Sequence, residues 1–473
     1  MGLRVTSDLA EFARESTYSS LPSEVREFVK FCILDQLGVQ AFGSTLQVPK
    51  LVRDYVLAGS TGACAIVGSS RRASAEGAAL ANGVSGHGFE LDDVHLPSLS
   101  HPGAAVVPAG LAVGELVGAT GQELIAAVAM GYEVMCRVGR GLSPSYAYDK
   151  GFHPQGVIGP LGAAVTAGVL LGLDAGELEH AMSLGVNHAG GTLQYTQTSC
   201  DSARLQAGLG AMGGVRSGLL AKAGLHGPGE IVEGRYGLAR VYSERVDFGL
   251  MTDDLGSVYS LMYNTFKVRP YHAMVHAAID VTLEALSTGT YETVGDIEQI
   301  VLGVTSHMRR FVDEENPHHL ADSAPRSISA MRYSLELSVA HAIVHGGELA
   351  GLLDLEEEAV IDGVTVDLAR RVLVTQDEEC EQEYYGGGHR GSKIKVKAEI
   401  ALRDRRKLRA ENYAKGSYEN QLSAIELRKK SEALLSRGTI RERSEAVSAM
   451  VLACDNLQSV NDLTRLLQSD ETN

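Results

Sequence analysis

Residues 86–103 read GHGFELDDVHLPSLSHPG and bring three acidic side chains and three histidines into one short stretch. Such groups could bind a metal ion, do acid/base chemistry on a small molecule, or form a solvated polar loop. The side chains of types that first-row metals accept are Asp92, Asp93, His95 and His101. Their spacing matches no standard set of metal ligands, so we expect no metal here.

Two histidines that each precede a proline favour the acid/base interpretation. His101 precedes Pro-Gly and an apolar segment, and His153 precedes Pro-Gln-Gly and a second apolar segment. A group at the start of a helix lies near the positive end of the helix dipole, where ligand carboxylates also bind well. We therefore expect both histidines to line one cavity, with Glu90 or Asp93 as the orienting acid.

A third histidine, His276 in RPYHAMVHAAID, follows two cations, Lys267 and Arg269. The composition changes at this point, which indicates a domain boundary, and ligand sites favour such interfaces. Lys267 and Arg269 are candidates for binding an anionic group of the substrate. The other histidines of the first stretch, His87 and His95, are predicted to be structural or peripheral.

The elements that must position these groups are predicted to be helices up to about residue 265. Apolar residues recur there at spacings of three and four, as in LIAAVAMGYEVMCRVG at 124–139. The segment LGAAVTAGVLLGL at 161–173 is apolar nearly all round, which is typical of a buried helix. Abundant glycine and alanine would let such helices approach closely.

A smaller α+β region is predicted after this helical part. Period-two, β-branched stretches at 294–308 and 392–404 indicate strands, and 330–347 is helical by period. The glycine-rich YYGGGHRGSK at 384–393 indicates a mobile loop.

The predicted fold is therefore mainly α with an α+β part. Residues 1–267 and 406–473 are expected to form one helical domain from both chain ends, and residues 268–405 a smaller α+β lid domain. The length of 473 residues fits two domains.

Composition excludes several classes of function. A net charge of −17 argues against binding nucleic acid or anionic membranes. No apolar run approaches the roughly 20 residues that span a bilayer, and the N-terminus has no apolar core typical of a signal peptide. The six cysteines are scattered, which favours a reduced, cytoplasmic protein.

Taken together, these segments resemble the MmgE/PrpD family, which contains 2-methylcitrate dehydratases, cis-aconitate decarboxylases and iminodisuccinate epimerases. The resemblance runs in order along nearly the whole chain and rests on ANGVSGHGFELDDVHLPSLSHPGAAVVPAGLAVGE, GYEV, GFHPQGVIGPLGAA, GPGEIVEG, KVRPYHAMVHAAID, RYSLELSVAHAIVHGG and KGSYENQLSAIELRKKSEALL. It implies a helical large domain built from both chain ends, an α+β lid, a homodimer, and no metal or organic cofactor.

The resemblance also implies roles for particular residues. The histidines of the family's active cleft match His101, His153 and His276, and its DFDD loop appears here as Glu90-Leu91-Asp92-Asp93. Glu90 thus replaces the first aspartate of that loop with a side chain one methylene longer.

Three departures from the family pattern bear on the substrate. The threonine that follows the acidic pair in the decarboxylases is Val94, and the family's tyrosine falls on Leu337. The family's lysine falls on Ala203, with Arg204 next to it. An arginine keeps the positive charge and can hold a carboxylate, but it is a far less useful acid.

The shared chemistry of the family is proton removal or delivery beside a carboxylate, which histidine suits because its pKa lies near neutrality. The sequence first favours a cofactor-free, 2-methylcitrate-dehydratase-like hydro-lyase acting on a small di- or tricarboxylate. An epimerase of a dicarboxylate such as iminodisuccinate, a cis-aconitate-type decarboxylase, and a repurposed biosynthetic or binding protein stay open as alternatives.

Overall fold

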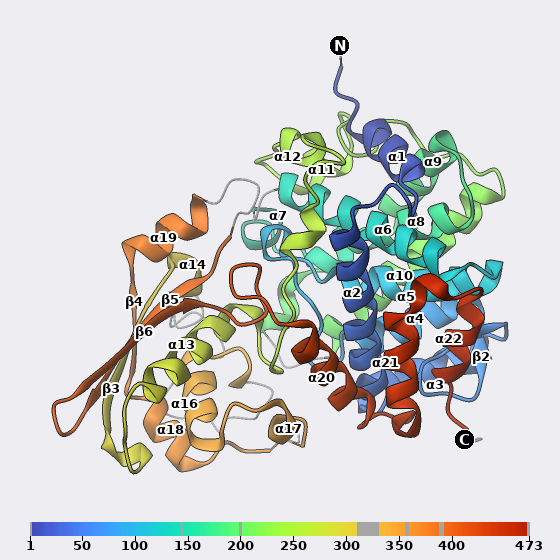
Figure 1. Cartoon of the computed structure of the whole chain (residues 1–473). Coiled ribbons are helices and arrows are strands. Elements are labelled where there is room, and N and C mark those ends of the chain that lie inside the picture. The colour runs from blue at the N-terminus through green and yellow to red at the C-terminus, as the bar shows by residue number, and fades with distance from the viewer. Residues whose placement is uncertain are drawn as a thin grey trace. The chain divides into compact units, whose positions relative to one another are not determined.

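The computed structural model describes residues 2–142, 145–197, 201–309, 331–354, 359–386 and 392–470. These residues form two compact units, one made of residues 1–264 with 423–473 and the other of residues 265–422. The larger unit is helical and the smaller one combines helices with a sheet, so the prediction of a mainly α fold with an α+β part is confirmed (Figure 1).

The helices of the larger unit come from two segments of the chain, one N-terminal and one C-terminal. The longer helices are α1 (Val5–Glu15), α2 (Ser23–Gly43), α3 (Gln47–Gly59), α4 (Ala75–Gly86), α5 (Pro102–Val117), α6 (Gly121–Gly141), α8 (Pro154–Leu170), α9 (Ala175–Val186), α10 (Ser202–Lys222), α20 (Ala424–Leu435) and α21 (Ser444–Leu452). Shorter elements are β1 (Cys64–Ala65), β2 (Arg72–Ala73), α7 (Ser145–Tyr148), α11 (Leu238–Tyr242), α12 (Gly249–Thr252) and α22 (Val460–Leu466). Helix α20 lies beside α2, as Figure 1 shows.

Close helix packing follows from the glycines of this unit, as the composition predicts. A Cβ atom on Gly131 of α6 would lie 1.9 Å from the hydroxyl oxygen of Thr166 on α8. A Cβ atom on Gly83 of α4 would lie 2.7 Å from the Cα atom of Gly208 on α10. Larger side chains at these positions would force the helices apart.

The smaller unit is built on a four-stranded mixed sheet. Its order is β4 (Val372–Gln376), β3 (Ile297–Val304), β5 (Lys395–Leu402), β6 (Lys407–Tyr413), with β3 and β4 parallel and the other pairs antiparallel. Its helices are α13 (His276–Ser287), α14 (Ser306–Arg309), α16 (Leu335–His345), α17 (Leu349–Leu352), α18 (Gly363–Ala369) and α19 (Glu378–Tyr385). The two predicted strands and the predicted helix near 330–347 are thus present as β3, β5 and α16.

The sheet shows where one expected boundary is displaced. A domain limit at residue 405 would separate β5 from β6, although Ala398 pairs with Ala410 across these strands. The smaller unit instead continues to residue 422. Half of the predicted glycine loop at 384–393, namely residues 387–391, lies outside the described residues.

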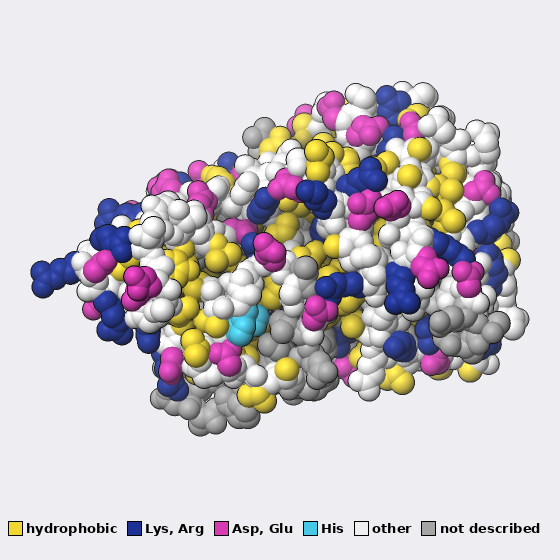
Figure 2. Space-filling view, turned by 60° about the horizontal axis from the view of Figure 1, so that its bottom comes forward, with side chains coloured by type: hydrophobic (Ala, Val, Ile, Leu, Met, Phe, Trp, Pro, Cys, Tyr) yellow, Lys and Arg dark blue, Asp and Glu magenta, His cyan; other side chains and the backbone are white. Residues whose placement is uncertain are grey.

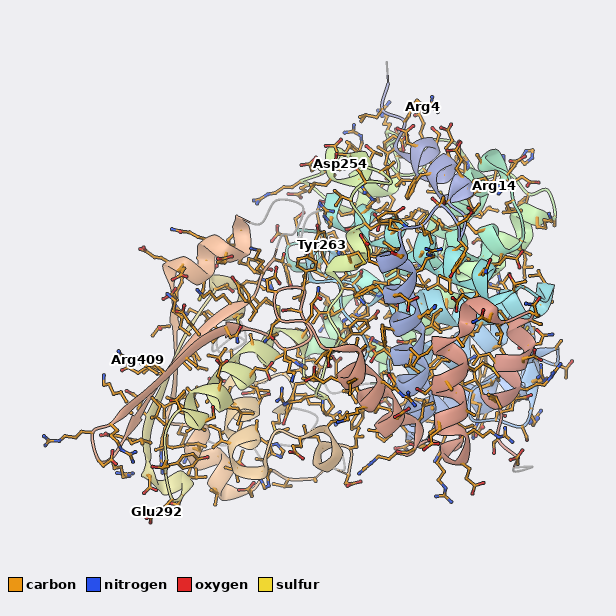
Figure 3. All side chains as sticks on the ribbon, in the orientation of Figure 1. Arg4, Arg14, Asp254, Tyr263, Glu292 and Arg409 are labelled. Atoms are coloured by element: carbon orange, nitrogen blue, oxygen red, sulfur yellow. The ribbon has the colours of Figure 1, made fainter. Side chains whose placement is uncertain are left out.

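Charged side chains are frequent among the exposed residues. Arg409 on the edge strand β6 projects away from the sheet in Figure 3 and is 69% exposed. Figure 2 shows basic and acidic side chains interspersed over the face in view. Such charges on an edge strand hinder pairing with another chain.

Two further findings concern membrane-spanning helices and the state of the cysteines. No helix in the described part of the chain has both the length and the apolar character needed to cross a membrane. The described cysteines are all buried and carry free thiols, namely Cys32, Cys64, Cys136, Cys380 and Cys454.

Candidate functional site

His101 and His153 each occupy the N-cap of a buried helix. His101 caps α5 and His153 caps α8, and in both helices proline follows at the first position. Proline suits this position because its missing N–H would have no partner within the helix. The expected placement of both histidines at helix starts is therefore confirmed.

His87, Asp92 and His101 form a compact hydrogen-bonded cluster. One carboxylate oxygen of Asp92, Oδ2, lies 2.6 Å from Nδ1 of His87 and 3.1 Å from Nδ1 of His101. The His87 and His101 ring centroids are 4.9 Å apart. Helix α4 ends at Gly86 and His87 is its C-cap, which brings the end of α4 to the start of α5.

The hydrogen bonds of His101 fix its tautomer. Nδ1 of His101 lies 2.8 Å from the backbone oxygen of Asp93, which can only accept a hydrogen bond. Nδ1 therefore carries a proton, and Nε2 is the nitrogen that is left to exchange a proton with a bound molecule. With a side chain 17% exposed, His101 retains access to solvent.

Gln155 holds the backbone of His101. Its Oε1 accepts a hydrogen bond of 2.9 Å from the amide of His101, and its Nε2 donates one of 2.6 Å to the carbonyl of His101. Gln155 lies on α8 two residues after His153, so this pair of bonds joins the starts of α5 and α8. Gln155 could not be predicted as a site residue from the sequence, because only the approach of the two helices reveals its role.

His153 is the third histidine of this cluster, next to His87 and His101. Its ring centroid lies 6.2 Å from that of His87 and 5.5 Å from that of Tyr195. Burial, together with the neighbouring His87 and His101, lowers the pKa of His153 to about 3. His153 is therefore neutral near pH 7 and can accept or donate a hydrogen bond, but it is no source of a proton.

Asp93 follows Asp92 in the acidic loop, and its carboxylate links this loop to the start of α5. Its Oδ1 accepts a bond of 3.0 Å from the amide of Gly103, and its Oδ2 accepts bonds of 2.7 Å from the Tyr132 hydroxyl and 2.6 Å from the Asn264 amide. Only 1% of Asp93 is exposed. The carboxylate that contacts His87 and His101 is that of Asp92, and an orienting role for Glu90 or Asp93 stays a prediction.

Asp93 also predicts a dependence of stability on pH. Burial is the main cause that raises the pKa of this carboxyl to about 7, and the charges of Asp35 and Asp92 add to it. In the unfolded chain the pKa is near 3.9, so the folded state binds the proton more tightly. The contribution is complete below about pH 4 and is lost as the pH rises through about 7.

We expect Asp93→Asn to remove this dependence. The free energy of unfolding of the wild type, minus that of the variant, should fall by on the order of 2 kcal/mol between pH 4.5 and 7.5. Urea unfolding of both proteins at several pH values measures it. Comparing the two proteins cancels the opposite effect of His153, whose lowered pKa weakens the fold on acidification. Parallel curves for the two proteins would show that Asp93 is not protonated in the fold.

Arg204 and Glu90 lie close to the imidazole cluster. Nε of Arg204 donates a bond of 3.0 Å to the carbonyl of Gly88, next to His87, and its guanidinium pairs with Asp201. Glu90 adopts a left-handed backbone conformation with φ of 55°. Its negative charge raises the pKa of His153 and so opposes part of the lowering caused by burial. Arg204 therefore brings a cation to the loop, whereas Ala203 brings none.

The other predicted site residues belong to the smaller unit. His276 begins α13, is 3% exposed, and has Nε2 3.1 Å from the carbonyl of Tyr271. Lys267 is buried, whereas Arg269 pairs with Asp280 and donates to the carbonyl of Gly347. These contacts of Arg269 link segments of the smaller unit to one another, and its role in binding substrate stays a prediction.

Two more positions from the family comparison are apolar and buried. Val94 in the acidic loop is 3% exposed, and Leu337 on α16 is fully buried. Neither supplies the hydroxyl group that the family pattern carries at that place.

That His87 is structural stays a prediction, but His87 is not peripheral to the cluster, because it contacts both Asp92 and the ring of His101. His95 does behave as predicted. It is fully buried, its Nδ1 lies 2.7 Å from the Ser98 hydroxyl, and burial lowers its pKa to about 3. No spacing rule in the sequence distinguishes the two histidines.

Three of these side chains also deserve a test as metal ligands. The ligand atoms of His87, Asp92 and His101 all lie within 4.8 Å of one another. Their closeness is accounted for by hydrogen bonds, in which the Nδ1 atoms donate, whereas a metal would require unprotonated nitrogen lone pairs. The site therefore fits a hydrogen-bonded cluster better than a metal centre.

We accordingly expect dialysis against a chelator to leave turnover and the melting temperature unchanged. Loss of turnover that returns on adding a divalent metal would contradict the hydrogen-bonded interpretation. Thermal unfolding in the same samples separates loss of a catalytic ion from loss of the fold.

Comparison with known proteins identifies the class of protein. Profiles of the MmgE/PrpD N-terminal and C-terminal domains match residues 7–251 and 270–456. The chain belongs to the MmgE/PrpD family, as its sequence motifs indicate.

Several curated relatives are cis-aconitate decarboxylases. The chain is 26% identical to one from Aspergillus terreus over 80% of each chain. It is 29% identical to the human cis-aconitate decarboxylase over 50% of each chain. It is also 29% identical to the cis-aconitate decarboxylase-like protein oryM of Aspergillus oryzae, over 49% of this chain and 50% of that protein.

Proposed function

We propose that this protein is a lyase that removes CO₂ from a small di- or tricarboxylate similar to cis-aconitate. The observation that carries the proposal is the contact of His87 and His101 with the carboxylate of Asp92, with the ring of His153 next to that of His87. It brings His101, which can exchange a proton, close to the neutral His153, in a family whose activities named above all act next to a carboxylate. The decarboxylase relatives favour this reaction.

The chemistry requires one proton per turnover. The bond between a carbon and its carboxylate breaks, the electron pair remains on the carbon, CO₂ leaves, and that carbon takes up a proton. We assign the proton donor as Nε2 of His101, since its Nδ1 is held by the Asp93 carbonyl. The Asp92 carboxylate stabilises the protonated imidazole, which is the role a carboxylate plays beside a catalytic histidine.

The other groups would bind and orient the substrate. His153 is neutral and suited to donating a hydrogen bond to a carboxylate of the substrate. Arg204 lies at the carbonyl of Gly88 and offers a planar guanidinium for a remaining carboxylate. The lysine of the family is replaced here, so the cation holds charge and does not serve as an acid.

Dehydration of a 2-methylcitrate-like acid is the second candidate. The sequence alone favours it first, but the curated relatives named above are decarboxylases, which reverses the order. The same histidines could remove a proton and deliver one to a departing hydroxyl. An epimerase needs two groups on opposite faces of one carbon and stays a third possibility.

Proton NMR in D₂O with a substrate panel tests the proposal. The panel holds cis-aconitate, citrate, 2-methylcitrate, iminodisuccinate and larger alkylcitrates. Loss of CO₂ with deuterium in the product would support decarboxylation, and new vinylic signals without loss of CO₂ would establish dehydration instead. Exchange of an α-proton without either change would establish an epimerase, and silence across the panel would overturn all three.

A further inference from the structure

Two glutamines of α2 are buried directly behind the histidine cluster. Gln36 is 1% exposed and Gln40 is fully buried, and they lie one helical turn apart. None of their four side-chain amide atoms has a hydrogen-bond partner within the described ranges of the chain. Each buried polar atom without a partner costs about 1–3 kcal/mol, so native proteins satisfy such atoms.

Gln36 lies between the two segments that carry His87 and His101. A Cβ atom on Gly86, the residue before His87, would lie 1.8 Å from Nε2 of Gln36. A Cβ atom on Gly103, two residues after His101, would lie 3.0 Å from Oε1 of the same glutamine. The carboxamide is therefore placed between the end of α4 and the start of α5, where only glycine leaves it room.

Further polar groups surround this position. The same hypothetical Cβ atom on Gly103 would lie 2.7 Å from Oδ1 of Asp93 and 2.7 Å from the hydroxyl of Tyr132. Gln40 approaches Gly86 through its Cγ atom, at 3.3 Å from the hypothetical Cβ. Buried sites with two to four such donors and acceptors are where proteins hold ordered water.

We propose that Gln36 and Gln40 bind a small cluster of buried water molecules that joins α2 to the segments of His87 and His101 and thereby positions both imidazoles around Asp92. The inference rests on the proposed function of the histidine cluster and assigns Gln36 as a positioning residue that does not touch the substrate. Water is the ligand that fits, because the surrounding groups include amides, a hydroxyl and a carboxyl, and a single water can both donate and accept hydrogen bonds.

The position of these waters explains why they would matter for the reaction. His87 and His101 share one oxygen of Asp92, so a small shift of α4 against α5 changes both hydrogen bonds. Misplacement of a catalytic group by about 1 Å can cost about 10²-fold in rate. Groups that support catalytic side chains from behind act through this geometry.

The structural arm of the test needs no substrate. A high-resolution crystal structure of the full chain should show ordered water within hydrogen-bond distance of the Gln36 and Gln40 amides. ¹⁵N NMR of histidine side chains should show altered signals for His87 and His101 in Gln36→Met, which keeps length but removes the amide. Direct protein partners for both amides, or a bound ion in place of water, would overturn the proposal.

The kinetic arm separates positioning from folding. We expect Gln36→Met to lower kcat about tenfold while KM changes less than about threefold, the pattern of a lost transition-state interaction. Gln40→Met serves as a second variant if the first fails to fold. The matched control is Thr166→Val, which removes a different buried polar group, a hydroxyl, from the helical core and should leave kcat unchanged.

The outcomes distinguish this inference from the proposed function. Unchanged kcat and unchanged histidine signals in Gln36→Met, with an active wild type, would overturn the positioning role alone. A wild type that is inactive on the whole panel would overturn the proposed function, while the crystal structure and the NMR signals still decide the water site.

Discussion

His101→Ala is expected to lower kcat/KM by about 10²–10⁴-fold, the range for losing a general acid. The fold should survive because the bonds from Gln155 go to the backbone of His101 and do not need its ring. The melting temperature should therefore stay within a few degrees of the wild type. Steady-state kinetics and thermal unfolding of the same preparation measure both quantities.

A matched control is His226→Ala, which removes an imidazole from the same unit away from the cluster. His226 is exposed and stacks on His180, so its loss should change neither rate nor fold. An active His101→Ala protein, or one that no longer folds, would show that His101 is a structural residue.

Lys430→Met is expected to cause the largest loss of stability. The ammonium of Lys430 lies 2.6 Å from the carboxylate of Asp35 and donates a bond of 2.9 Å to the carbonyl of Leu91. Both charged side chains are nearly fully buried, at 4% and 1% exposure. Removing one partner of such a pair leaves the other charge buried, which costs about 3–5 kcal/mol.

The effect should extend to the active cluster, since Leu91 precedes Asp92 in the acidic loop. Urea unfolding should show the loss, and the double variant Asp35→Asn, Lys430→Met should recover part of it because no unpaired charge remains. Lys407→Met is the control, because its pair with Glu399 is exposed and worth under about 1 kcal/mol. Equal losses in Lys430→Met and in the double variant would contradict a cost due to the charge of Asp35.

Much of the fold is predictable from short patterns. The apolar periodicity of α6 and α8 and the alternation of β3 and β5 reflect local burial, which the sequence records directly. Strand β6 was missed because KLRAENY is mostly polar, as an edge strand can be. The parallel partner β4 was missed as well, although the β-branched residues of VLVTQ are typical of a strand.

The candidate site was predictable in part. Histidines before prolines mark helix starts, which identified His101 and His153. His87 and Gln155 were not found, because they join the site through the packing of α4, α5 and α8 and through no motif of their own. The buried Gln36 could not be predicted either, since no motif in the sequence of α2 distinguishes it from the other residues of that helix.

The central claim is that His101 delivers the proton that replaces CO₂. Its most direct test is the incorporation of solvent deuterium into the product of cis-aconitate, followed by NMR for the wild type and for His101→Ala. We expect the wild type to release CO₂ and to place one deuterium on the carbon that lost it, and the variant to do neither at a measurable rate. Equal deuterium incorporation by both proteins would contradict the assignment of His101 as the acid.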